Sequence, residues 1–139
     1  FDKYIFKKRT EALKTKNSFY TPKGKVSAKE ILEGVINNKN IFLLVDQKDS
    51  AGSFINFFGK KVKTQTGFLK IARKYNLKII PMKNIRLPDN TLQITFEEPL
   101  EHNIDTISDD KKMLEINAIV EQWIKANPEN WFWQHKRFN

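Results

Sequence analysis

The sequence contains no cysteine, two histidines and five glycines among its 139 residues. Without cysteine the chain has no disulfide, no thiolate metal ligand and no cysteine nucleophile. A metal site built on His102 and His135 would also need carboxylates. The glycines are scattered, and no serine lies in a Gly-x-Ser-x-Gly elbow, so we expect neither a phosphate-binding glycine loop nor a self-contained serine hydrolase. The sequence therefore predicts no metal and no cofactor.

Long apolar runs are absent as well. The longest, residues 41–45 and 131–133, are far shorter than the ~20 residues needed to cross a bilayer, and no signal peptide is visible. Hydrophobic residues still make up 40% of the chain, which is enough for the core of one domain over residues 1–139. Because the chain opens on Phe1, within a basic stretch, we expect it to be a fragment of a longer protein.

Acidic residues are scarce in two blocks of the chain. Residues 1–29 carry nine lysines and arginines against two acids, and residues 60–90 carry nine against one, within a formal net charge of +9. Such blocks attract polyanions, which include nucleic acid, anionic lipid, phosphorylated sugars and an acidic carrier protein. A lysine-rich composition can also serve only to keep a protein soluble, so the net charge does not identify which of these partners the chain binds.

The apolar pattern predicts alternating helices and strands. A capped helix is expected over residues 26–38, and a buried strand at 41–45 leads into a polar loop at 46–53. A helix over 66–75 and a second apolar strand at 77–81 complete a strand, helix, strand unit, which is typical of a parallel pair. We therefore expect an α/β fold whose mainly parallel central sheet has flanking helices.

The second half of the chain predicts a hairpin and a long helix. Residues 84–87 and 91–96 flank the turn Pro88-Asp89-Asn90, and the alternation directs Leu92, Ile94 and Phe96 inward. A last helix begins near Ser108 and stops before Asn127-Pro128. Its apolar stripe consists of Met113, Ile116, Val120, Trp123 and Ile124.

Two places in the sequence are candidates for chemistry. Asp46 directly follows the predicted central strand, where a carboxylate either lines a ligand site or caps its own loop by accepting backbone hydrogen bonds. The segment 128–138 combines three large aromatic residues with His135, Lys136 and Arg137. Its tryptophans can stack on bases, sit at a membrane interface or pack on the core, and we favour packing. His102 lies in a polar connection and is expected to be a solvated loop residue.

Taken together, these segments resemble the C-terminal half of the bacterial lipid A biosynthesis acyltransferases, the late lauroyl and myristoyl transferases. The closing Pro-Glu-x-Trp-x-Trp-x-His-Arg-Arg-Phe pattern of that family is specific, and here Lys136 replaces its first arginine. The resemblance covers essentially the whole chain and rests on these further positions: Asp46-Gln47, Gly52, Phe57-Phe58-Gly59, Thr66-Gly67, Ile80-Pro81 and Arg86.

The resemblance implies a glycerolipid-acyltransferase-like fold that is incomplete at its N-terminus. It further implies an enzyme that moves a fatty acyl chain from acyl carrier protein to a hydroxyl of a phosphorylated lipid A precursor, in lipopolysaccharide biosynthesis. Such enzymes are held on the cytoplasmic face of the bacterial inner membrane by an N-terminal hydrophobic helix. That helix would be missing here, and no nucleic-acid partner is implied.

The family's catalytic motif, a histidine with an aspartate five positions later, is not found in this sequence. Five positions after His102 stands Ile107, and His135 is four residues from the last position given. We therefore expect no catalytic residue in this chain, which would be inactive alone. By the resemblance, Asp46 and Gln47 line the site, and Arg86 and Arg9 bind acceptor phosphates or the acidic carrier.

The tail residues His135 and Arg137 recur in the family and complete the expected set of substrate-binding residues. A packing and hydrogen-bonding role is as consistent with this recurrence as a catalytic one. A nucleic-acid or anionic-surface binding module is the alternative function, because the charge is +9 and the tail is rich in tryptophan. A third possibility is an acyltransferase-like chain that only scaffolds partners.

Overall fold

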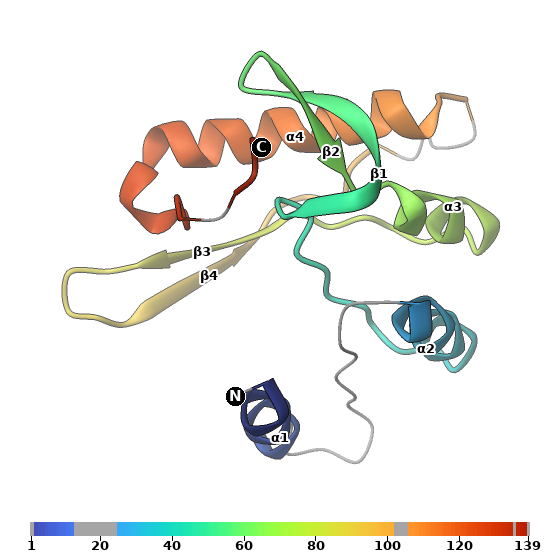
Figure 1. Cartoon of the computed structure of the whole chain (residues 1–139), viewed down its shortest axis with the longest axis horizontal. Helices are drawn as coiled ribbons and strands as arrows, with labels where there is room; N and C mark the ends of the chain where they lie inside the picture. The colour runs from blue at the N-terminus through green and yellow to red at the C-terminus, as the bar shows by residue number, and fades with distance from the viewer. Residues whose placement is uncertain (1, 13–24, 102–105, 135, 139) are drawn as a thin grey trace. The chain divides into compact units, whose positions relative to one another are not determined.

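The structure is a computed structural model, and Figure 1 shows its course. The residues that it describes are 2–12, 25–101, 106–134 and 136–138. They form two compact units, Phe1–Leu43 and Leu44–Asn139, which we describe separately. Within the described residues, no helix is at once long enough and apolar enough to cross a bilayer.

The first unit contains two helices, α1 (Asp2–Ala12) and α2 (Lys25–Ile36). The predicted helix over 26–38 is confirmed by α2. It ends where expected, because Asn38 adopts a left-handed φ of 55°, which asparagine tolerates. Lys39 N donates to Gly34 O at 2.9 Å and closes the last turn.

The second unit contains two hairpins and two α-helices. Its elements are β1 (Lys48–Phe57), β2 (Lys60–Thr64), α3 (Gly67–Lys74), β3 (Met82–Arg86), β4 (Leu92–Phe96), α4 (Asp109–Ala126) and the 3-10 turn η1 (Pro128–Asn130). β1 pairs antiparallel with β2, and β3 pairs antiparallel with β4. The fold is therefore a mixture of helices and small antiparallel sheets.

The mainly parallel central sheet expected from the sequence is not what the described residues form. Residues 41–45 form no strand, and Phe42 and Leu44 are 68% and 72% exposed. Residues 77–81 form no strand either, and β1 occupies most of the predicted polar loop 46–53. β1 pairs instead with the segment directly after it, because a two-residue turn brings that partner close at small entropic cost. The glycerolipid-acyltransferase-like architecture stays a prediction.

The turn between β1 and β2 consists of Phe58 and Gly59, both at positive φ (49° and 73°). This geometry matches the twist of a two-residue hairpin, although positive φ is unfavourable for phenylalanine. The carboxylate of Glu121 on α4 offsets that cost by accepting a 2.7 Å hydrogen bond from Phe58 N. A second bond, from Asn117 Nδ2 to Asn56 O at 2.8 Å, also joins α4 to β1.

Helix α4 supplies one side of the core, as its predicted stripe indicated. Ser108 caps it as expected, since its Oγ accepts from Lys111 N at 3.3 Å. Met113 and Ile116 pack with Ile55, Leu69 and Ala72 in one cluster. In the other cluster, Val120 and Ile124 pack with Phe57 and Val62. Figure 1 shows the β1–β2 hairpin crossing α4, with which β1 is in contact.

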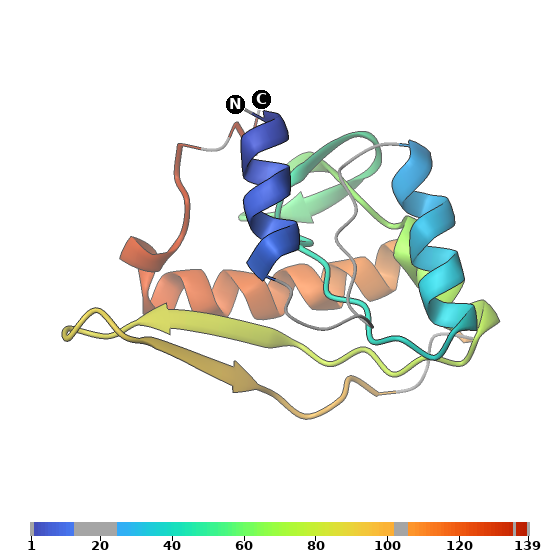
Figure 2. The ribbon, with the colours of Figure 1, turned by 90° about the horizontal axis from the view of Figure 1, so that it is seen from below.

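The β3–β4 hairpin is confirmed, but its predicted orientation is wrong. Leu92, Ile94 and Phe96 are between 57% and 61% exposed, so they do not point into the core of this unit. The opposite face lies toward α4, where Lys83 Nζ is 5.6 Å from the centre of the Trp123 ring. Figure 2 shows the hairpin along α4. Alternation identified the two faces but not which of them is covered, because both carry apolar residues.

Gly52 provides a test of the β1–β2 packing. The register of the pair shifts between Lys48 and Ser53, because both of these residues pair with Thr64. A Cβ atom on Gly52 would lie 2.2 Å from the backbone carbonyl oxygen of Thr64, which is too close for two non-bonded atoms. We expect Gly52→Ala to lower the free energy of unfolding by roughly 2–3 kcal/mol, because the strands must separate to admit the methyl group.

Denaturant unfolding of the Gly52→Ala variant measures this change. Gly67→Ala is the matched control, because nothing lies within 4 Å of a Cβ there and the position opens a helix. Equal stability of the two variants would contradict the close approach at Gly52.

Candidate functional site

Asp46 lies two residues before β1, in a stretch without regular secondary structure. Its side chain is half-buried, and Oδ2 accepts a 2.9 Å hydrogen bond from Nε1 of Trp131, 85 positions later in the chain. The sequence left open whether Asp46 lines a ligand site or caps its own loop. The structure shows a side-chain partner from the tail, by which we mean the described residues of 128–138.

Trp131 is held by several rings. Its ring centre is 4.7 Å from that of Trp133, 6.0 Å from that of Phe57 and 6.3 Å from that of Phe138. η1 begins at Pro128, as a proline in a first helical turn should, and Trp131 is its C-cap. Packing of Trp131 against the core is therefore confirmed.

Trp133 is placed differently. It is 56% exposed, and its Nε1 donates to Pro128 O at 2.7 Å. Phe132 is exposed as well. The expectation that the tail tryptophans pack on the core is thus met by Trp131 and not by Trp133.

Arg137 is the most unusual residue of the tail, because it is a cation only 1% exposed. Nη1 donates to Lys63 O at 2.6 Å, and Nη2 donates to Thr64 Oγ1 at 2.7 Å. The guanidinium also lies over the Phe57 ring, 5.1 Å from its centre. Burial lowers the pKa of Arg137 below its usual value, and the negative charge of Asp46 opposes that shift. These contacts anchor the tail to β2.

The other predicted site residues lie apart or are not placed. Gln47 is exposed beside Asp46, and the exposed Arg86 ends β3, where its backbone N donates to Asn130 Oδ1 at 2.9 Å. Arg9 is exposed on α1 in the first unit, whose position relative to the second is not defined. His135 and His102 lie outside the described residues. The structure therefore joins Asp46 to the tail and the β3–β4 hairpin to η1.

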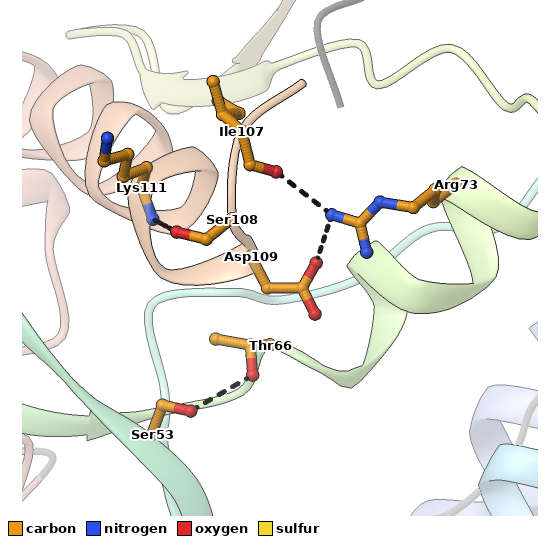
Figure 3. A network of polar contacts seen from close by, with 7 residues as sticks. All are labelled: Ser53, Thr66, Arg73, Ile107, Ser108, Asp109 and Lys111. Carbon is orange, nitrogen blue, oxygen red and sulfur yellow. Dashed lines mark hydrogen bonds and ion pairs between the residues drawn. The ribbon is translucent and has the colours of Figure 1, made fainter. Parts of the chain in front are cut away.

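A second polar cluster joins the start of α4 to α3 (Figure 3). Arg73 Nη2 lies 2.7 Å from Asp109 Oδ1 and donates to Ile107 O at 3.3 Å. Nearby, the hydroxyls of Ser53 and Thr66 lie 3.5 Å apart. The charged groups of this cluster neutralise each other, so we assign it a structural role. No group of three metal-ligating side chains occurs in the part of the chain that the structure describes.

The pairing of Asp46 with Trp131 and the anchoring of Arg137 on Thr64 were both missed by sequence reasoning. Local patterns report neighbours three or four positions away on a helix and two away on a strand. They carry no information about partners more than 70 positions apart. The only signal available was the concentration of aromatic residues and cations in the tail, and it indicated an anchor without indicating its target.

The anchoring role of Arg137 can be tested by Arg137→Met, which keeps an apolar stem and removes the guanidinium. Lys63 O and Thr64 Oγ1 then lose their donor, and we expect the free energy of unfolding to fall by about 2 kcal/mol. Lys136→Met is the matched control, since Lys136 is the exposed neighbour and its loss should change stability by less than about 0.5 kcal/mol. Thermal denaturation compares the two, and equal melting temperatures would refute the anchor.

Comparison with known proteins gives one clear result. The family model described as bacterial lipid A biosynthesis acyltransferase matches residues 3–139. Comparison with individual curated proteins gave no match. The match spans nearly all of the chain, including Asp46, the β3–β4 hairpin and the tail. The chain belongs to the bacterial lipid A biosynthesis acyltransferase family.

Proposed function

We propose that this chain is the substrate-binding part of an enzyme that transfers a fatty acyl group from acyl carrier protein to a hydroxyl of a lipid A precursor. The observation that carries the proposal is the family match over residues 3–139. The reaction belongs to lipopolysaccharide biosynthesis, and we place it at the cytoplasmic face of the bacterial inner membrane.

In the proposed reaction, the acyl group moves from the sulfur of a thioester to the oxygen of a hydroxyl group. The acceptor oxygen attacks the thioester carbonyl, a C–O bond forms and the C–S bond breaks, and the hydroxyl proton passes through a general base to the departing thiolate. Negative charge develops on the carbonyl oxygen meanwhile, so nearby cations and N–H donors stabilise the transition state. Neither histidine here has an aspartate five positions later, so the base is assigned to a part of the enzyme other than residues 1–139.

Within this scheme the chain binds and orients the substrates. We assign the carboxylate of Asp46 and the amide of Gln47 to hydroxyl groups of the sugar acceptor. Arg86 is exposed at the end of β3, where its guanidinium can bind a phosphate with two parallel hydrogen bonds. Arg9 is a second candidate for a phosphate or for the acidic carrier.

The charge distribution supports acidic partners. In residues 60–90 nine cations stand against one acid, Asp89, and most of these lysines are exposed. Acyl carrier protein, anionic lipid and the acceptor phosphates are all negative, so this excess of exposed cations attracts each of them. This attraction should weaken as the salt concentration rises.

The activity itself is tested with the full-length protein, acyl carrier protein loaded with a fatty acid, and a phosphorylated lipid A precursor. Mass spectrometry of the lipid should show one added acyl group. A full-length protein that is folded yet transfers no acyl group to this lipid would overturn the proposed function.

The role of Arg86 yields a sharper prediction. In the full-length protein, Arg86→Ala should lower kcat/KM roughly 10- to 100-fold through a higher KM, because a hydrogen bond to a charged group contributes about 1.5–3 kcal/mol. Lys111→Ala removes the same charge from the exposed first turn of α4 and should leave KM unchanged. Equal KM values for the two variants, measured at several acceptor concentrations, would exclude Arg86 as a phosphate ligand.

A further inference from the structure

Asp46 lacks the support that a residue inside a strand or helix receives. It precedes β1 by two residues, so no ladder of backbone hydrogen bonds fixes its direction. Among the described residues, the hydrogen bond to its carboxylate comes from the indole of Trp131, at 2.9 Å. The orientation of Asp46 therefore depends on the tail.

Trp131 is itself a rigid donor. Its ring packs edge-on against Trp133 and contacts Phe57 and Phe138, so the indole cannot turn without displacing neighbouring rings. Its backbone N donates to Pro128 O at 3.3 Å in η1. A donor fixed in this way imposes its direction on the acceptor, which is the requirement for a preorganised site.

Arg137 anchors the tail that carries Trp131. Its bonds to Lys63 O and Thr64 Oγ1 fix the guanidinium within the protein, and Phe57 lies beneath it. Asp46 favours the charged form of Arg137 through space. The tail segment that carries Trp131 is therefore attached to β2.

We infer that Trp131 is a positioning residue for Asp46: its indole N–H fixes the direction of the carboxylate. The inference rests on the proposed function, because it concerns how Asp46 acts on the acceptor. A carboxylate that orients a sugar hydroxyl must be held closely, since a misplacement of about 1 Å can cost 100-fold in rate. Trp131 touches no substrate in this scheme and acts through Asp46.

A double-mutant cycle in the full-length protein tests the inference. Trp131→Phe keeps a ring and loses the N–H donor. Its matched control is Trp133→Phe, whose indole donates to Pro128 O and not to Asp46. We expect Trp131→Phe to lower kcat/KM about 10- to 100-fold relative to Trp133→Phe, the range for losing a hydrogen bond to a charged group.

The same substitutions in an Asp46→Ala background, which has no acceptor for the indole N–H, separate positioning from packing. If Trp131 acts through Asp46, then Trp131→Phe should change kcat/KM less than twofold once Asp46→Ala is present. An equal fold-loss in both backgrounds would mean that Trp131 only supports the fold, and would overturn the inference. Melting temperatures of all variants report any general loss of stability.

A direct measurement of the contact completes the test. In ¹⁵N-labelled protein, Asp46→Asn should move the indole N–H resonance of Trp131 and leave that of Trp133 in place. If both indole resonances stay in place, or move equally, the contact is refuted.

Failure of the proposed function is recognised separately. If the wild type transfers no acyl group, the function is wrong, whereas wild-type activity in Asp46→Ala shows only that Asp46 and its positioning residue Trp131 play no part.

Discussion

The tail of the second unit is held in place by one buried cation, Arg137. Removing a guanidinium from water is costly, so Arg137 is stable inside the protein only because a backbone carbonyl, a hydroxyl and an aromatic face surround it. Thr64 can be one of those partners because β2 places it on the inner face of the hairpin, fully buried. The position of the tail, and with it the position of Trp131 and Asp46, follows from this requirement.

The sequence predicted well those elements whose signals are local. Helix α4 has an acidic first turn, a capping serine and a regular apolar stripe, and all three are properties of neighbouring residues. The β3–β4 hairpin was likewise predicted, because Pro88-Asp89-Asn90 forms its turn from its own side chains. There, Asp89 Oδ1 accepts from both the hydroxyl and the backbone N of Thr91, which holds the pKa of Asp89 below its usual value.

The central sheet was mispredicted for the opposite reason. An apolar run such as 41–45 shows that side chains avoid water, but it does not show which backbone will supply the hydrogen bonds of a strand. In the described structure the turn Phe58-Gly59 pairs β1 with β2 directly, and residues 39–47 form neither helix nor strand. Of the candidate site, Asp46 and Arg137 were both singled out, yet their relation through Trp131 depends on packing that no local pattern encodes.

The tail also constrains the order in which the protein can form. Its partners are distant along the chain: 85 positions separate Asp46 from Trp131, and 73 separate Thr64 from Arg137. Contacts of such long range form late, because the entropy of closing the loop is lost before any contact is gained. During synthesis, the β1–β2 hairpin must wait for the last segment of residues 1–139 to leave the ribosome before its inner face is complete. Until then Phe57 and Thr64 lack their partners in the tail, and the nascent chain is exposed to proteases and to aggregation.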